Sequence, residues 1–220
     1  MTDFSVARTN MVDCQIQTAG VAHADILAAF SNVPRELFVP KASQKIAYMD
    51  EDLVIGDGRF LMEPITHARM LQAASPQKDD VVLDISNTNG YSAAILSTLV
   101  TTIVCIEEKK KGLDQNLSIL ADIDVCNVAG FKGDLVKGCP EHAPYDLIFM
   151  GGSVTELPTE LIKQLGPNGR LITIVKPDGE MMGQVTLVQS LGEKGFSSYT
   201  LFEAACPYLP GFEPRDSFTF

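Results

Sequence analysis

Three acidic residues lie at or just after the ends of apolar runs of this chain, and a glycine lies where a helix is expected to begin. Asp84 and Glu107 end two short apolar runs and are 23 residues apart (107 − 84 = 23), with Gly90 between them. Gly133 and Asp134 follow a third run. An acid at the end of the second strand of a parallel sheet accepts hydrogen bonds from ribose hydroxyl groups. The spacing therefore predicts a site for a nucleoside-type cofactor, with Asp134 near the edge of the base.

The loop between Asp84 and Gly90 narrows the choice of cofactor. It lacks the G-x-G-x-x-G pattern that seats the pyrophosphate of a dinucleotide. S-adenosylmethionine carries no phosphate and tolerates a looser loop. The alternative interpretation is that Asp84 and Glu107 only cap strands and that Asp134 lies in a solvated turn. The predicted cofactor-binding set is Asp84, Ser86, Gly90, Glu107, Gly133 and Asp134.

The segments that must position these residues alternate between apolar runs and amphipathic stretches. This alternation predicts an α/β fold with helices on both faces of a parallel sheet. The last two runs are joined without a helix, as expected for a mostly parallel sheet with a reversed edge strand. The predicted strands are 81–85, 102–107, 125–129, 146–151, 170–175, 185–191 and 198–204, and the predicted helices are 22–32, 64–74, 91–99, 109–121 and 157–165.

The length of 220 residues suits one large domain or one domain with an appendage. The change of pattern predicts an N-terminal helical segment on the substrate side, residues 1–76, and an α/β domain, residues 77–220, packed as one compact unit. The chain is long enough to fold without a metal or a disulfide.

The overall charge argues against several classes of partner. Seventeen basic and 28 acidic residues give a net charge of −11, which would repel nucleic acids and anionic membranes. The five cysteines are odd in number and have no C-x-x-C spacing, so we expect reduced thiols. The N-terminus has no signal-peptide pattern, and no apolar run approaches the ~20 residues of a membrane span. We expect a cytoplasmic protein, and no pattern indicates its oligomeric state.

Several stretches of the chain resemble protein-L-isoaspartate O-methyltransferases along nearly its whole length. Two of them, VPRE-x-FVP and AY-x-D…IG-x-G, are marks of this family that generic methyltransferases lack. The resemblance implies a Rossmann-like S-adenosylmethionine-dependent methyltransferase fold. It also implies protein repair, by methyl transfer to the abnormal carboxylate of L-isoaspartyl residues in damaged proteins or peptides. The matching stretches are MVDCQI (11–16), VPRELFVP (33–40), AYMDEDLVIGDG (47–58), LDI…GYSAAIL (83–96), IE (106–107), GD (133–134), YDLIFM (145–150) and QLGPNGRLITIV (164–175).

The first departure from the family lies in the loop after residue 85. The family has glycine where this chain has Ser86 and Thr88, and only Gly90 remains. Asn87 and Asn89 tolerate left-handed conformations, so the turn itself can form. The added side chains lower cofactor affinity if they point at the cofactor.

The second departure lies at the expected acceptor site. The family's Gln-Thr-Ile-Ser-type run is Arg59-Phe60-Leu61-Met62 here, and Met62 replaces a serine that is taken to position the reacting carboxylate. Met62 cannot donate a hydrogen bond and is not expected to be catalytic. The guanidinium of Arg59 can hold a carboxylate by two hydrogen bonds, so Arg59 is the candidate clamp. The alternative is a surface arginine beside a glycine turn.

Three functional hypotheses follow, because methyl transfer needs alignment and a dry site rather than a nucleophile of the protein. The leading one is an isoaspartyl methyltransferase with weak but measurable cofactor binding. The second is a methyltransferase for another carboxylate or small acceptor. The third is a non-catalytic binding or regulatory protein that keeps the fold. His67 is expected to be structural, and the C-terminal segment CPYLPGFEPRDSFTF to pack as an irregular tail over the sheet edge.

Overall fold

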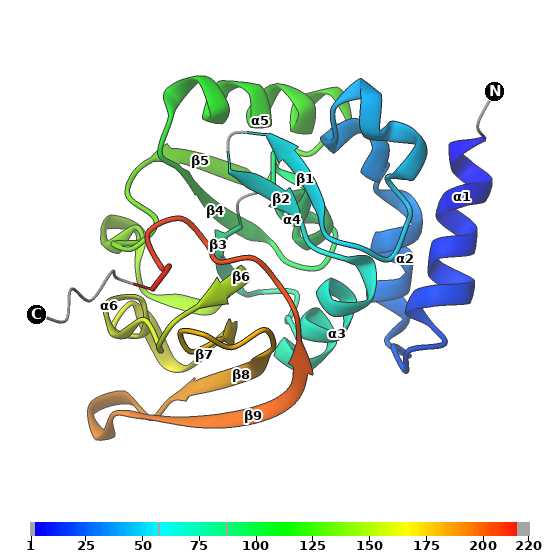
Figure 1. Ribbon diagram of the computed structural model, residues 1–220. Coiled ribbons are helices and arrows are strands. Elements are labelled where there is room, and N and C mark those ends of the chain that lie inside the picture. Colours follow the sequence, from blue (N-terminus) through cyan, green and yellow to red (C-terminus); the bar gives the residue numbers. More distant parts are fainter. Residues whose placement is uncertain (1–2, 57, 87, 215–220) are drawn as a thin grey trace, which may run out of the picture.

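The computed structural model describes residues 3–56, 58–86 and 88–214, and its centre is a seven-stranded sheet of order β5-β4-β3-β6-β7-β8-β9 (Figure 1). Strands β3 to β7 run parallel, and β8 is antiparallel to both of its neighbours. The strands are β3 (Val81–Ile85), β4 (Thr102–Glu107), β5 (Val128–Lys132), β6 (Tyr145–Val154), β7 (Leu165–Val175), β8 (Gly183–Ser190) and β9 (Phe196–Ala204).

The predicted fold class is confirmed, with one correction to the sheet. The reversed strand is β8, which lies one place in from the edge, and the edge strand β9 again runs in the direction of β7. A short connection between two strands makes them antiparallel, and the chain reverses once between β7 and β8 and again between β8 and β9.

The two faces of the sheet bury separate apolar clusters. Val82 of β3 and Leu147 of β6 pack with residues of α2 to α4, whereas Leu83 and Ile148 pack with residues of α6. Neighbouring residues of a strand point to opposite faces, so the central strands β3 and β6 are buried on both sides, as their apolar composition predicts. The helices are α1 (Phe4–Met11), α2 (Ala24–Asn32), α3 (Pro64–Ala74), α4 (Tyr91–Ser97), α5 (Lys110–Asp122) and α6 (Thr159–Ile162), with shorter 3₁₀ or π turns at η1 (Val12–Ile16), η2 (Arg35–Phe38), η3 (Lys41–Ile46), η4 (Pro140–His142) and η5 (Gly192–Lys194).

Several predicted boundaries are wrong; β7, for example, begins at Leu165 rather than at residue 170, and β6 ends at Val154 rather than at residue 151. Strand β5 begins at Val128 rather than at residue 125, because α5 is followed by a turn in which Asp124 has a φ of 60°. Helix α6 has only four residues, because the chain already pairs with Tyr145 of β6 at Leu165. The sequence pattern also did not predict the hairpin of β1 (Leu53–Gly56) and β2 (Arg59–Leu61), which forms a separate two-stranded sheet.

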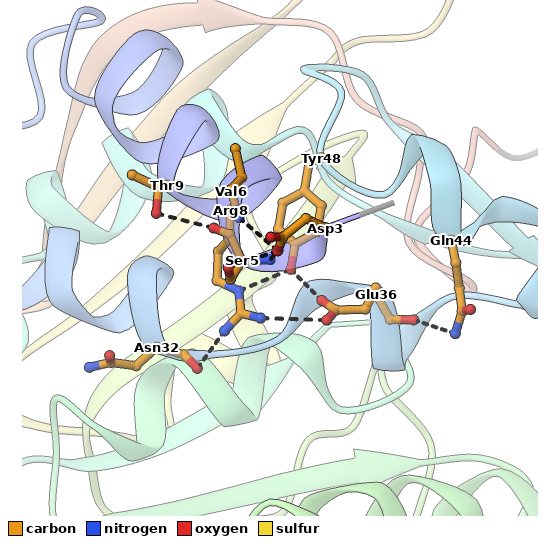
Figure 2. A network of polar contacts seen from close by, with 9 residues as sticks. All are labelled: Asp3, Ser5, Val6, Arg8, Thr9, Asn32, Glu36, Gln44 and Tyr48. Atoms are coloured by element: carbon orange, nitrogen blue, oxygen red, sulfur yellow. Dashed lines mark hydrogen bonds and ion pairs between the residues drawn. The ribbon is translucent and has the colours of Figure 1, made fainter. Parts of the chain in front are cut away.

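A polar network ties helix α1 to the segments that carry the family-like marks (Figure 2). The guanidinium of Arg8 donates to the Tyr48 hydroxyl at 3.0 Å, to the carbonyl of Asn32 at 3.2 Å and to Glu36 at 3.4 Å. The Tyr48 hydroxyl in turn donates to the Glu36 carboxylate, and Gln44 donates to the Glu36 carbonyl. Glu36 lies in the 33–40 stretch and Tyr48 in the 47–58 stretch. Hydrogen bonds therefore join the two stretches that resemble the family.

The same stretches also fix the beginning of α3. The fully buried guanidinium of Arg35 donates to the carbonyls of Ala47 at 2.7 Å and Met62 at 2.8 Å. Asp52 accepts a 2.8 Å hydrogen bond from the backbone N–H of Glu63, and Asp50 accepts one from Ile65. These contacts hold the β1–β2 hairpin between the N-terminal segment and the sheet.

The segment after β9, residues 205–214, is named here the C-terminal strap. It returns across the sheet toward the end of β6, as the red part of Figure 1 shows. The Ser153 N–H donates to the carbonyl of Pro207, Leu209 donates back to Ser153, and Thr155 donates to Phe212. Residues 205–214 therefore pack beside a central strand, because backbone groups at the end of β6 pair with them. The predicted packing over the sheet edge is wrong for this part of the tail, and residues 215–220 of the predicted tail lie outside the described residues.

The larger apolar cluster joins side chains on both sides of the predicted division at residue 76, among them Met11, Phe30, Val82 and Val185. The two-part division of the chain stays a prediction. None of the helices within the described parts of the chain has the length and apolar character that a membrane span requires.

Candidate functional site

Glu107 ends strand β4 and lines a pocket of about 330 Å³. The pocket is bounded by the β1–β2 hairpin at Gly58 and Arg59, by the turn from β4 into α5, and by Tyr208 of the C-terminal strap. The Glu107 carboxylate accepts a 3.3 Å hydrogen bond from the backbone N–H of Lys109. An acid in this position has the location that ribose recognition requires, and the volume lies within the range of small-molecule pockets.

Gly112, in the first turn of α5, provides the space for this carboxylate. A Cβ atom built on Gly112 would lie 2.9 Å from the Cδ atom of Glu107, closer than real Cβ contacts. The glycine is therefore required for the observed position of Glu107. The sequence analysis did not identify it, although a buried glycine in a polar helical stretch, KKKGLDQ, is an unusual choice with a cost in helix stability.

Arg59 lies between this pocket and a second one. Its Nη1 atom is 3.8 Å from the Oε2 atom of Glu107, and both side chains are 14% exposed. Arg59 also lines a pocket of about 340 Å³ with Phe38, Ile55, Asn89 and Gln115. The predicted acceptor clamp and the predicted ribose acid are therefore direct neighbours, which the sequence spacing alone did not indicate.

Asp84 is almost fully buried at the end of β3, beneath two serine hydroxyls. Its Oδ1 atom accepts hydrogen bonds from Ser86 at 2.5 Å and from Ser92 at 3.0 Å. Burial raises the pKa of the Asp84 carboxyl to about 7, and the two hydroxyls partly oppose this shift. Asp84 therefore organises the loop from below, through its hydrogen bonds with Ser86 and Ser92.

The side chains that replace loop glycines are directed into the protein. Ser86 lies against Gly151 of β6. A Cβ atom added to Gly151 would be 2.5 Å from the Oγ atom of Ser86. The Thr88 hydroxyl accepts a 3.2 Å hydrogen bond from the backbone N–H of Ser92 in α4. Neither Ser86 nor Thr88 is among the described residues that line the pocket at Glu107.

Two residues give the loop its left-handed backbone. Asn89 has a φ of 49° and donates a 3.1 Å hydrogen bond to the carbonyl of Phe38, 51 residues earlier. Gly90 has a φ of 93°, which a residue with a side chain rarely adopts. The prediction that Asn89 tolerates this conformation is confirmed, whereas the same prediction for Asn87 lies outside the described residues.

Gly133 and Asp134 follow β5 but form a turn of their own. Asp134 accepts a 3.0 Å hydrogen bond from the N–H of Val136 and lies 3.7 Å from the ammonium group of Lys137. The N–H of Gly133 donates to the carbonyl of Glu107, which places this turn beside the end of β4. The described lining of the Glu107 pocket includes neither residue, and their cofactor role stays a prediction.

Met62 and His67 belong to the apolar core beneath the hairpin. Met62 is 2% exposed, and its carbonyl is held by Arg35. His67 packs among the rings of Phe30, Tyr91 and Phe149, and burial lowers its pKa to about 3. A neutral, buried imidazole agrees with the structural role predicted for His67, and Met62 offers no polar group at the acceptor position.

The arrangement can therefore hold a nucleoside and an acidic group side by side. Glu107 offers oxygen acceptors to ribose hydroxyls, and Arg59 offers a guanidinium to a carboxylate. Among the described residues, no group of histidine, cysteine and acidic side chains has metal-binding geometry. The contact of the Glu107 carboxylate with Gly112 is the observation that best fits a bound nucleoside. A side chain at position 112 would displace the Glu107 carboxylate.

Comparison with known proteins gives a consistent result. Residues 7–204 match the family model described as Protein-L-isoaspartate(D-aspartate) O-methyltransferase (PCMT). A protein-L-isoaspartate O-methyltransferase of Methanoculleus marisnigri is 37% identical over 185 residues, which cover 84% of each chain. A protein-L-isoaspartate O-methyltransferase 1 of Rhodopseudomonas palustris is 32% identical over 215 residues, covering 90% of this chain and 88% of the relative.

Solved structures show the same similarity at the level of the fold. A protein-L-isoaspartate O-methyltransferase superposes with a TM-score of 0.81 at 25% identity, covering 93% of this chain and 66% of the other. A Plasmodium falciparum protein assigned to the same activity, solved in complex with S-adenosyl-L-homocysteine, has a TM-score of 0.74 at 18% identity and covers 95% and 99%. The second similarity shows the fold alone.

Proposed function

The chain belongs to the protein-L-isoaspartate O-methyltransferase family, and on that premise we propose that it transfers a methyl group from S-adenosylmethionine to the free carboxylate of L-isoaspartyl residues in damaged proteins. The observation that carries the proposal is the position of Glu107, which lines a pocket at the end of the second parallel strand. An acid at this point of the sheet is what recognition of an adenosyl group requires.

Glu107 would hold the ribose of the cofactor, and the backbone at Gly58 would cover it from the hairpin side. Asp84 would act through Ser86 and Ser92, by keeping the loop that opens α4 in its observed conformation. When bound, S-adenosylmethionine supplies an activated methyl group to an acceptor oxygen. The protein supplies alignment, since the attacking carboxylate is already a nucleophile.

The C-terminal strap and the hairpin would exclude water from the site. Leu209 of the strap is fully buried, and a Cβ atom built on Gly152 would meet both Leu209 and Phe60 of the hairpin. Apolar side chains at the end of β6 would keep water from this side of the site, which would strengthen the polar contacts of the acceptor carboxylate.

Calorimetric titration with S-adenosyl-L-homocysteine tests the cofactor half of the proposal. We expect weak but measurable binding by the wild-type protein and a loss of about tenfold or more on Glu107→Ala, because the ribose hydroxyls lose their acceptor. Glu141→Ala, at an exposed site on η4 outside the described lining of this pocket, is the matched control and should bind as the wild type does. Equal affinities of the Glu107→Ala and wild-type proteins would contradict the assignment of Glu107.

Transfer of a labelled methyl group tests the acceptor half. A peptide with one L-isoaspartyl residue should become labelled, and the same peptide with L-aspartate should not. Ligand binding without transfer to the isoaspartyl peptide would favour another carboxylate acceptor. No binding at millimolar ligand would favour a non-catalytic protein that keeps the fold.

The remaining expectations about the protein's surroundings belong to the same proposal. The five cysteines are unpaired, which supports a reducing compartment, and we propose the cytoplasm. The partner is a damaged protein or peptide. The net charge of −11 disfavours nucleic acids and anionic membranes as partners.

A further inference from the structure

The ion pair between Arg59 and Glu107 places a cation at the acid that would bind the ribose. The two side chains are 3.8 Å apart at their charged atoms, and each is 14% exposed. Ribose hydroxyls and the guanidinium are both hydrogen-bond donors, so they compete for the same carboxylate oxygens. A ribose hydroxyl that binds at Oε2 of Glu107 would therefore weaken the ion pair.

Arg59 also belongs to a second pocket. It lines the pocket on the other side of the hairpin, where Phe38, Ile55 and Ile119 supply apolar walls. Within the described lining of this pocket, Arg59 is the one charged side chain, and Asn89 and Gln115 add carboxamides. The guanidinium of Arg59 is complementary to a carboxylate.

From these contacts we infer that Arg59 exchanges between Glu107 and the carboxylate of the acceptor, and so couples acceptor binding to cofactor binding. This inference rests on the proposed function. An acidic acceptor in the pocket at Phe38 and Asn89 takes over the guanidinium and releases Glu107 for the ribose. By thermodynamic linkage, each ligand then raises the affinity of the protein for the other by the same factor.

The pocket also favours a short acidic side chain over a simple anion. Its volume of about 340 Å³ exceeds that of an inorganic anion, and Leu37 and Ile119 in its lining can contact the peptide or hydrocarbon to which a carboxylate is attached. Inorganic anions gain nothing from such walls. The acceptor class is therefore a carboxylate on an apolar or peptide carrier.

Titration with S-adenosyl-L-homocysteine, alone and with saturating peptide, tests the coupling. For the wild-type protein we expect a peptide with one L-isoaspartyl residue to tighten binding about threefold to tenfold, the range for a partly exposed ion pair. The matched peptide with asparagine in that position should not. The Arg59→Gln variant should bind the ligand about threefold to tenfold more tightly without peptide and should show no further effect of peptide. Lys111→Gln removes a different cation, which lines the pocket at Glu107, and this variant should keep the wild-type coupling between peptide and ligand.

The outcomes separate this inference from the proposed function. If the wild-type protein binds S-adenosyl-L-homocysteine and methylates the peptide, but Arg59→Gln binds the ligand no more tightly, the exchange of Arg59 is wrong and the proposed function stands. Persistent coupling in Arg59→Gln would likewise overturn it. If neither protein binds the ligand, both ideas fail. Binding by Arg59→Gln alone would support the exchange in its strongest form.

Discussion

The hydroxyl of Ser86 donates a 2.5 Å hydrogen bond to the Oδ1 atom of Asp84, so a side chain that replaces a loop glycine points into the protein. The missing side chain of Gly151 on the neighbouring strand provides the room for it. The loss of this glycine therefore does not by itself close the pocket at Glu107. The substitution adds a polar contact beneath the loop.

Replacing Ser86 by alanine tests the structural weight of that contact. Ser86→Ala keeps the Cβ atom but leaves the buried Asp84 with Ser92 as its remaining side-chain partner in the described structure. We expect a loss of about 1–3 kcal/mol in the free energy of unfolding, measured with urea at pH 8. Ser118→Ala, at an exposed site on α5, is the control and should cost much less. An unchanged midpoint for Ser86→Ala would show that the bond contributes little.

The raised pKa of Asp84, about 7 against an ordinary value of 3.8, makes stability depend on pH. Between about pH 4 and pH 7 the folded protein retains a proton that the unfolded chain has released. Linkage then requires this residue's contribution to stability to fall as the pH rises through that window. Asp84→Asn lacks this dependence, so its free energy of unfolding should improve relative to wild type from pH 5 to pH 8.

Comparing the two proteins at each pH cancels the contributions of other buried groups, such as Asp52, whose pKa burial raises to about 6, and His67, whose pKa burial lowers to about 3. Urea unfolding at several pH values measures the difference. Parallel pH profiles for the wild-type protein and Asp84→Asn would show that the carboxyl titrates normally in the fold.

Gly112→Ala should separate ligand binding from stability. The new Cβ atom would lie 2.9 Å from the Cδ atom of Glu107 and must displace the carboxylate, while alanine itself favours the helix by about 1 kcal/mol. We expect thermal stability near that of wild type and an affinity for S-adenosyl-L-homocysteine reduced about tenfold. Wild-type affinity in this variant would mean that Glu107 does not need its observed position.

Tyr48→Phe removes the hydroxyl that joins Arg8 to Glu36. The charged partners stay partly buried without it, and we expect a loss of about 1–3 kcal/mol in the free energy of unfolding. Tyr199→Phe makes the same chemical change on strand β9, where the side chain is 53% exposed, and should be nearly neutral. Equal costs at the two sites would argue against a stabilising network.

Leu209→Ala tests the C-terminal strap. The side chain is fully buried against the end of β6, so its truncation should cost about 2–5 kcal/mol and loosen the strap. We also expect slower methyl transfer to the isoaspartyl peptide at saturating ligand, because water reaches the site. Leu201→Ala on β9, where the side chain is 42% exposed, should change neither quantity much. Full activity in Leu209→Ala would remove the strap from the site.

The sheet was predictable because its central strands, such as β3 and β6, are apolar runs buried on both faces, and α3 begins and ends where the pattern places it. The β1–β2 hairpin was not predictable, because its strands have only four and three residues and because the outward-facing Val54 is apolar, so the residue types do not alternate as their burial does. Arg35 reaches Met62 across 27 positions, a contact that no local pattern encodes.

The site divides in the same way. Glu107 was predictable, since the end of the second strand of a parallel sheet is fixed by topology. Its contact with Arg59 was not, because that requires knowing how the hairpin folds over the sheet. The place of Gly112 and Tyr208 in the pocket lining was not predictable, because it depends on how α5, the C-terminal strap and β4 pack together.

The contacts of Arg35, Glu36 and Tyr48 have an evolutionary consequence. These residues bind one another's segments and leave the ligand pockets to other side chains. Mutations at the loop or the acceptor run can therefore accumulate without loosening the frame, and the frame can be inherited while its chemistry drifts. A lineage of such proteins would stay recognisable by these contacts between segments long after its catalytic preferences had changed.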